Sequence, residues 1–307
     1  MMVKNIRFFS PLILWLQGRS QGILSHKPGR SRRFSFGAMA ILTAFVCVTL
    51  IAPVRAVPLG DILLRSIQVI QISNISERQE VQLGAQMHEN LLRQGTRVSG
   101  DTVLNRYVTD VGLRLSEAGN RKIPYRFHVV EDKAVNAFAT MGGYVYVTTG
   151  LMRAADNEAQ LASVIGHEIG HIEKRHLIAQ IRQSMIARGL VASTLGQSQL
   201  ANIGVDLLVS RPASRQDEYE ADQVGLRLLR DATYATSAMP AFMQKLVRGG
   251  SSPTILSSHP AVPARLRALE KAIASGVRNR CNEDGSAQIC GLDERAYASQ
   301  VKQRLLI

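Results

Sequence analysis

The segment Ser163-Val-Ile-Gly-His-Glu-Ile-Gly-His171 contains residue types that could bind a metal ion and use it in catalysis. His167 and His171 are four residues apart, so on an α-helix their imidazoles stand one turn apart on the same face. Glu168 is rotated by about 100° from His167, close enough to hold a water on the ion without being a ligand. A zinc ion would lower the pKa of this water and polarise a peptide carbonyl, while Glu168 takes and returns the proton. The segment therefore predicts one Zn²⁺ per chain, with His167 and His171 as ligands and Glu168 as the catalytic base.

The pattern His-Glu-x-x-His also occurs by chance, as two helix histidines and a surface glutamate. Three features argue against chance in this chain. The preceding run Leu161–Ile165 is apolar, as expected of a buried helix. Gly166 and Gly170 lie beside the histidines, where larger side chains would crowd an ion. Catalytic zinc usually has a third protein ligand, and a source of such a ligand follows downstream in the sequence.

That source is the helix predicted over residues 216–230, which carries several carboxylates. Glu218 and Asp222 fall within about 40° of each other on its apolar face, whereas Glu220 points about 200° away into solvent. A carboxylate on a buried face is costly unless it is paired or bound to metal, so Glu218 and Asp222 both need partners. Helical phase alone does not exclude Asp217 as a ligand.

The helices and strands expected from the sequence indicate a mostly helical α+β fold with a small sheet. These elements must position the residues named above. Residues 124–130 and 144–148 alternate as two strands, joined by a turn-rich link over 136–143. The metal-binding helix is expected from Asp156 to about Arg175. The other helices are expected at residues 76–93, from 100 to about 115, and at 177–196, 216–230, 237–247, 261–274 and 293–305.

Three histidines lie outside the metal-binding segment in this scheme. His88 is expected to be a solvated helix residue, and His128 a strand side chain. His176 is nine residues after His167, which places it on the opposite face if the helix stays regular, so it is not expected to be a ligand.

Most of the net charge belongs to the N-terminal region. The chain has 307 residues and a formal charge of +13, but residues 1–56 carry eight Lys and Arg and no acid, which leaves +5 for the rest. The positive charge is therefore no sign of nucleic-acid binding, and that function is excluded.

Residues 1–56 are typical of a signal peptide. A basic cluster at Arg30–Arg33 precedes the apolar run Phe36–Ile51, and cleavage after Ala56 fits the small residues there. The partial twin-arginine pattern leaves the export route open. The alternative is an uncleaved N-terminal anchor, with membrane association through residues 36–51.

Two cysteines, Cys281 and Cys290, remain after this region, in a loop rich in Gly, Asn and Asp. They fit a disulfide formed in an oxidising compartment, because the alternative, a zinc clip, lacks two further ligands nearby. Residues 57–275 are expected to form one domain, and residues 276–307 a disulfide loop and helix packed on it.

Several further motifs occur in one order along residues 75–275. They are Asn136-Ala-Phe, Gly142-Gly-Tyr-Val-Tyr, Gly150-Leu, Asn157-Glu158, His167-Glu-Ile-Gly-His171, Arg175-His176, Glu218-Tyr-Glu-Ala-Asp222-x-x-Gly225 and Ser258-His259-Pro260. Together they resemble family 48 of the metallopeptidases, the zinc metallopeptidases that include HtpX and the CAAX-prenyl endopeptidases. The compact exported members of that family are the most similar type.

The resemblance implies a zincin-like (gluzincin) core with a small antiparallel sheet beside the metal-binding helix. It implies His167, His171 and Glu218 as the metal ligands, Glu168 as the base, and Asp222 as the partner that orients a ligand histidine. His259 is expected in a loop near the zinc, as a regulatory or catalytic group. The edge of the strand Tyr144–Val147 is expected to bind substrate as an added β-strand.

The function expected from these observations is that of an exported zinc endopeptidase in the periplasm or cell envelope. Its partners would be protein or peptide substrates, namely misfolded or unassembled envelope proteins. The alternative is a zinc-bound chaperone or scaffold that holds such proteins without cutting them. Glu168 favours the enzyme, because a purely structural metal site gives it no task.

Overall fold

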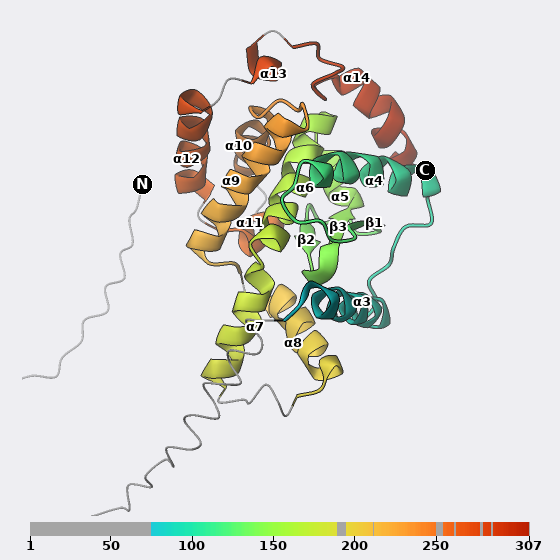
Figure 1. Cartoon of the computed structure of the whole chain (residues 1–307). Coiled ribbons are helices and arrows are strands. Elements are labelled where there is room, and N and C mark those ends of the chain that lie inside the picture. Colours follow the sequence, from blue (N-terminus) through green and yellow to red (C-terminus); the bar gives the residue numbers. More distant parts are fainter. Residues whose placement is uncertain are drawn as a thin grey trace, which may run out of the picture. The chain divides into compact units, whose positions relative to one another are not determined.

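The structure is a computed structural model that describes residues 75–188, 195–210, 212–249, 254–260, 262–276, 279–283 and 285–306. The predicted signal peptide or anchor at residues 1–56 lies outside the described residues and stays a prediction. Figure 1 shows helices around a small sheet. The helices are α3 (Glu77–Arg93), α4 (Thr102–Glu117), α5 (Thr149–Ala154), α6 (Glu158–Glu173), α7 (His176–Ala187), α8 (Gln197–Ser210), α9 (Arg215–Asp231), α10 (Ala238–Arg248), α11 (Thr254–Ser258), α12 (Val262–Ser275), α13 (Arg280–Glu283) and α14 (Glu294–Tyr297). The expected mostly helical α+β fold is confirmed.

The sheet has three strands in the order β1-β3-β2, namely β1 (Arg126–Val130), β3 (Tyr144–Thr148) and β2 (Ala137–Ala139). β1 pairs with β3 in parallel and β2 pairs with β3 antiparallel, so the expectation of a purely antiparallel sheet is wrong. The difference arises because the link expected to be turn-rich contains a strand, β2, between the two that were predicted. β3 is therefore central, and the expectation that its edge is free for substrate is wrong. Among the described residues, the unpaired edge of the sheet beside α6 (Glu158–Glu173) belongs to β2.

Side-chain caps begin the helices that matter for the site. Asn157 caps α6 by accepting a hydrogen bond from the Gln160 backbone N–H. Ser214 and Asp217 form a capping box at the start of α9, which gives Asp217 a structural role there. α6 ends at Glu173, two residues before its expected end.

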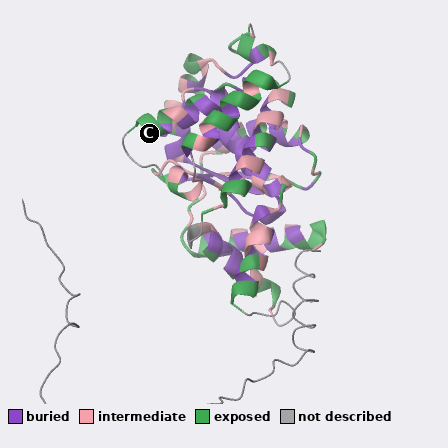
Figure 2. Ribbon diagram, turned by 90° about the vertical axis from the view of Figure 1, so that its left-hand side faces the viewer, coloured by how far each residue is buried: buried purple, intermediate pink, exposed green. Residues whose placement is uncertain are grey.

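Buried residues run through the centre of the molecule (Figure 2). α6 is buried over almost its whole length, as its apolar sequence predicts. A larger hydrophobic core joins α6 to α4, α9, α10 and the sheet, and a second one lies among α3, α7 and α8. α6, the helix expected to bind the metal, is therefore fixed by packing on several sides.

His88 differs from its expectation of a solvated side chain. Because α3 lies against the sheet, the His88 ring stacks on His128 of β1, with 4.6 Å between ring centroids. Its Nδ1 is 2.9 Å from the hydroxyl of Tyr146. Burial lowers the pKa of His128 to about 4 and also lowers the pKa of His88, so neutral rings pack against each other at neutral pH. His128 is a strand side chain, as expected.

The C-terminal segment contacts the start of the metal-binding helix. Cys281 and Cys290 form the expected disulfide. The next residue, Gly291, accepts a hydrogen bond from the Ala159 backbone N–H in the first turn of α6. The buried Tyr297 donates its hydroxyl hydrogen to the Met152 carbonyl. In place of the long terminal helix expected at 293–305, α14 continues into one π turn and one 3₁₀ turn.

None of the helices within the described residues is both long enough and apolar enough to cross a membrane.

Candidate metal centre

α6 carries the two histidines of the motif on one face. The rings of His167 and His171 are 4.7 Å apart between centroids, and their Nε2 atoms are 3.1 Å apart. Burial lowers the pKa of His167, which favours the neutral imidazole that binds metal.

Close packing of α9 on α6 brings Glu218 to these histidines. A Cβ on Gly170 would lie 2.7 Å from the Ala221 carbonyl oxygen, so only glycine allows this approach. Gly166 faces Gly225 in the same contact. The glycines were expected to leave space for an ion; instead they let α9 approach α6.

Glu218 is completely buried and lies between the two histidines. Its Oε1 is 3.4 Å from His171 Nε2, and its Oε2 is 3.6 Å from His167 Nε2. Burial by itself raises the pKa of Glu218, but hydrogen bonds from His171 and His259 outweigh it and hold that pKa below its usual range. The expected phase of this helix is confirmed, because Glu218 and Asp222 face the core.

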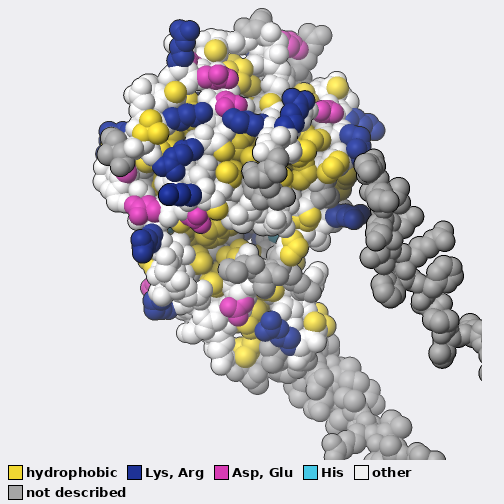
Figure 3. All heavy atoms as spheres, turned by 180° about the vertical axis from the view of Figure 1, so that it is seen from behind, with side chains coloured by type: hydrophobic (Ala, Val, Ile, Leu, Met, Phe, Trp, Pro, Cys, Tyr) yellow, Lys and Arg dark blue, Asp and Glu magenta, His cyan; other side chains and the backbone are white. Residues whose placement is uncertain are grey.

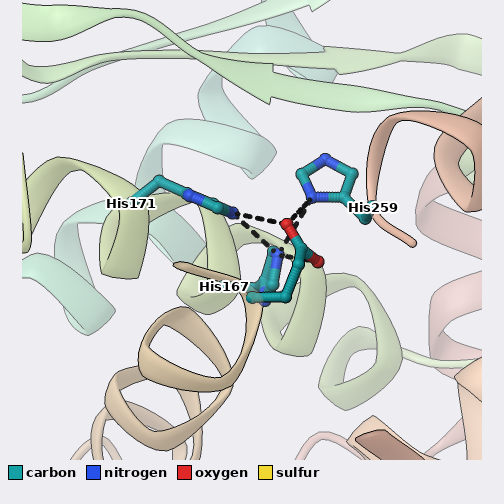
Figure 4. A group of neighbouring side chains, drawn as sticks. His167, His171 and His259 are labelled. Carbon is teal, nitrogen blue, oxygen red and sulfur yellow. Dashed lines mark hydrogen bonds and ion pairs between the residues drawn. The ribbon is translucent and has the colours of Figure 1, made fainter. Parts of the chain in front are cut away.

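His259 completes a group of four side chains. Its Nδ1 lies 3.0 Å from Glu218 Oε1 and 3.2 Å from His167 Nε2. Figure 4 shows His167, His171 and His259 converging on one carboxylate below the sheet. One ligand atom from each of His167, His171, Glu218 and His259 lies within 4.8 Å of the others.

These distances fit a tetrahedral metal site. Zinc ligands at about 2.1 Å from the ion lie about 3.4 Å from one another, which matches the spacings between these side chains. Three imidazoles and a carboxylate also present lone pairs to one point, and a cation is the species that satisfies all of them.

Asp222 orients His167. Its Oδ1 accepts a hydrogen bond from His167 Nδ1 at 2.9 Å, which leaves the Nε2 lone pair directed at the metal site. Burial raises the pKa of Asp222, but hydrogen bonds from Arg265 and His167 outweigh it and keep the carboxyl ionised.

Arg265 of α12 was not predicted as a site residue. Its guanidinium donates two hydrogen bonds to Asp222, at 2.7 and 2.6 Å, and another to Glu218 Oε2. Arg265 is only 3% exposed, so it balances two buried carboxylates. One signal in the sequence could have indicated its role. Arg265 is a basic residue on the apolar face of the helix that directly follows His259.

The position of His176 differs from the expected one. α6 stops at Glu173, and Arg175 adopts a left-handed conformation with φ 56°, so His176 starts a new helix instead of continuing the old one. Its Nδ1 lies 2.9 Å from His171 Nδ1, and its Nε2 lies 3.4 Å from Glu220. His176 therefore positions His171, and Glu220 contacts it instead of pointing freely into solvent.

Glu168 lies beside the group of four and faces a cleft. It is 2% exposed, and its Oε1 has no hydrogen-bond partner among the described residues. This oxygen is 3.4 Å from His259 Nε2. The cleft, called the main cleft below, has a volume of about 70 Å³ and runs from β2 past Glu168 and His171 to α7. On the face seen in Figure 3, hydrophobic side chains surround a hollow between the upper and lower parts of the molecule.

Comparison with known proteins agrees with this geometry. The family model described as Peptidase family M48 matches residues 102–273. The chain belongs to peptidase family M48. The match covers α4 to α12, so every member of the group of four lies within the segment typical of M48.

Curated relatives of this M48 protein are named proteases. It is 32% identical over 230 residues to the beta-barrel assembly-enhancing protease of Escherichia coli K12. The aligned region covers 69% of this chain and 45% of that protein. It is 27% identical over 258 residues to the metalloprotease LoiP of the same organism, covering 80% of this chain and 98% of LoiP. The mitochondrial metalloendopeptidase OMA1 of Arabidopsis thaliana is 34% identical over 154 residues, which cover 49% of this chain and 32% of OMA1. The chain thus spans about half the length of the beta-barrel assembly-enhancing proteases it matches.

Proposed function

We propose that this protein is an exported zinc endopeptidase that cuts misfolded or unassembled envelope proteins. The observation that carries the proposal is the convergence of His167, His171, Glu218 and His259 beside Glu168, which faces a cleft bordered by a strand edge. Membership of peptidase family M48 supports the same reading.

His167, His171 and Glu218 would hold one zinc ion. Bound there, zinc supplies a Lewis acid that polarises a peptide carbonyl and lowers the pKa of a water. Glu168 would accept the proton of the attacking water at Oε1, which has no hydrogen-bond partner among the described residues, and return it to the departing amine. Asp222 keeps His167 in the ligating tautomer, and His176 contacts the outer nitrogen of His171.

The edge of β2 would bind the substrate backbone. Thr148 N–H bonds to the Asn136 carbonyl, and Thr140 N–H bonds to the Tyr144 carbonyl. Backbone pairing alternates along an antiparallel ladder, so the N–H and C=O groups of Ala137 and Ala139 point away from β3. They can pair with an extended peptide, and because Ala139 lines the main cleft, this peptide would pass over Glu168.

The proposed location and substrates rest on two observations. A disulfide near the C-terminus fits an oxidising compartment such as the periplasm. Two relatives, the beta-barrel assembly-enhancing protease and LoiP, are named proteases of a bacterium, and the first name refers to assembly of β-barrels.

The function is tested with the protein comprising residues 57–307. Zinc analysis should find one ion per chain, and casein should be cleaved, with the activity lost on chelation and restored by zinc. Zinc-loaded protein that prevents aggregation of an unfolded client but leaves casein intact would instead support the alternative chaperone or scaffold.

Loss of a residue that only supports a metal ligand typically weakens metal binding by roughly 10- to 100-fold. Glu218→Ala should weaken zinc binding by more than this, because it removes a ligand itself. Glu220→Ala is the matched control on the same helix and should retain one zinc per chain. Metal content after dialysis against a weak chelator distinguishes the two. Loss of zinc from Glu220→Ala alone would mean that the ligand assignment on α9 is wrong.

We propose that His259 holds the enzyme in a resting form by taking the fourth ligand position. α11, which precedes it, is tied to the substrate-binding region, since Ile255 N–H donates to the Val135 carbonyl just before β2. A peptide pairing with β2 would therefore disturb the helix that positions His259.

His259→Ala should raise the basal rate of casein cleavage about threefold to tenfold. Without the resting form in which His259 takes the fourth ligand position, a larger fraction of the protein molecules can bind and cleave substrate. Ser257→Ala, an exposed change on the same helix, should leave the rate unchanged. A fall in kcat for His259→Ala would show instead that His259 stabilises the transition state.

A further inference from the structure

Glu80 of α3 is a buried carboxylate that the mechanism described above does not use. It is only 1% exposed, and it lies in the wall of the main cleft. Arg121 binds it with both terminal nitrogens, from Nη1 to Oε1 and from Nη2 to Oε2, each at 2.9 Å. A buried carboxylate needs a partner of opposite charge, and Arg121 alone already supplies one. The further contacts of Glu80 join it to two parts of the proposed active site.

The first of these contacts is with the chain segment between α6 and α7. Arg175 Nη2 lies 3.1 Å from Glu80 Oε2 and also donates a hydrogen bond to the Ile75 carbonyl at 2.7 Å. Among the described residues, Glu80 is the one carboxylate that pairs with Arg175. Arg121 Nη1 also donates to the Ile172 carbonyl in the last turn of α6, at 3.0 Å. Two guanidinium groups bound to one carboxylate therefore hold the end of α6 and the start of α7.

The backbone of Arg175 determines where His176 lies. Arg175 has φ 56° and ψ 35°, a left-handed conformation that is unfavourable for a residue with a side chain and persists only where its surroundings hold it. This conformation ends α6 and turns the chain, so that His176 Nδ1 lies 2.9 Å from Nδ1 of the proposed ligand His171. Because Glu80 holds the Arg175 side chain, it stabilises the bend that places His176 against His171.

The second contact is with the turn Met141–Gly143, which follows β2. The Gly142 backbone N–H donates a long hydrogen bond to Glu80 Oε1, at 3.5 Å. The two backbones are also in contact, since a Cβ on Gly142 would lie 2.7 Å from the Glu80 carbonyl oxygen. A Cβ on Gly84, one turn later in α3, would lie 2.2 Å from the Met141 carbonyl oxygen. The turn that ends the proposed substrate-binding strand therefore packs directly on the first turns of α3.

We propose that Glu80 is a positioning residue that fixes the substrate-binding strand β2 relative to the metal ligand His171. It acts through Gly142 on one side, and through Arg175 and His176 on the other. Hydrolysis requires the scissile carbonyl and the metal to be held in one geometry, and a displacement of about 1 Å can cost roughly 100-fold in rate. The proposal rests on the proposed endopeptidase function, but its effect on His171 can be measured without a substrate.

The test variant is Glu80→Gln in the protein comprising residues 57–307. The amide keeps the size of the side chain but cannot balance the charge of Arg175. We expect kcat/KM for casein to fall roughly tenfold to 100-fold in the folded fraction. Zinc affinity, measured by competition with a chelator, should fall about threefold to tenfold, because a ligand loses part of its support. The visible spectrum of the cobalt-loaded protein should shift, because the orientation of His171 changes.

Glu77→Gln is the matched control on the same helix. Glu77 also pairs with Arg121, at 3.2 Å, but its side chain is 62% exposed and it does not line the main cleft. This variant should keep the spectrum, the zinc affinity and kcat/KM of the unmutated protein. A residue that only supported the fold would lower the free energy of unfolding and leave all three unchanged in the folded protein.

Arg175→Gln tests the same connection from its other end. The Arg175 side chain is 32% exposed, so this variant should fold even if Glu80→Gln does not. It should reproduce the spectral shift and the weaker zinc binding, and the double variant should be no worse than either single one. An unchanged spectrum and zinc affinity in folded Glu80→Gln or Arg175→Gln, equal changes in Glu77→Gln, or additive effects in the double variant would each overturn the proposal. A spectral shift in Glu80→Gln, with no cleavage by the unmutated zinc-loaded protein, would support the role of Glu80 at the metal centre and overturn the proposed protease.

Discussion

Glu168→Gln should lower kcat for casein cleavage by about 10²- to 10⁴-fold while the protein still binds one zinc per chain. The amide keeps the shape of the side chain but cannot accept a proton. His167, His171 and Glu218 remain, so the metal content should not change. Zinc analysis and initial rates of casein digestion, measured on the same preparations, separate the two effects.

The matched control is Glu158→Gln, at the start of the same helix. Glu158 accepts hydrogen bonds from the hydroxyls of Tyr107 and Tyr234 and lies more than two helical turns before His167. That variant should lose some stability but little activity in the folded fraction. Undiminished cleavage by Glu168→Gln would instead show that Glu168 is not the base of the reaction.

Arg265→Met should destabilise the protein by about 3–5 kcal/mol, the cost of removing one partner from a buried ion pair. Glu218 and Asp222 are both almost fully buried and would lose their cation, which bridges them in the structure. Asp222 would also lose the hydrogen bonds that hold it against His167, so zinc binding should weaken. Urea unfolding of the metal-free protein measures the first effect, and metal titration measures the second.

Two further variants sharpen this result. Arg230→Met breaks a pair with Asp231 in which both side chains are about one-third exposed, and should cost no more than about 1 kcal/mol. Arg265→Lys restores the charge without the two-pronged geometry, so it should fall between Arg265→Met and the unmutated protein. If Arg265→Met were as stable as Arg230→Met, the buried network would not depend on the guanidinium.

The helix faces that carry the proposed metal ligands were predictable, because each depends on spacing within a single helix. The choice of Glu218 over Asp217 as a ligand came from the resemblance to family 48. Four residues separate His167 from His171, and the apolar face of the next carboxylate-bearing helix includes Glu218 and Asp222. The opposite holds for Arg265, whose role depends on where α12 lies in space, which helical periodicity does not reveal. Its contacts cross 43 and 47 residues of sequence.

Two of the wrong placements have local causes. His176 was misplaced because the chain breaks at Arg175, a non-glycine residue with positive φ, which has no clear sequence signal. The sheet order was wrong because β2 has three residues, too few to show an alternating pattern beside the glycines that follow it.

The hydrogen bond between Ala159 and Gly291 bears on how this domain is delimited. The M48 match ends at residue 273, but the first turn of α6 is held by a backbone carbonyl beyond that point. Cys290 and Tyr297 also belong to the same hydrophobic core as α6. A fragment trimmed to the homologous segment would therefore uncover apolar surface at the base of α6. The unit that packs around α6 is longer than the segment that the family model matches, and during synthesis it can close only after Tyr297 has emerged.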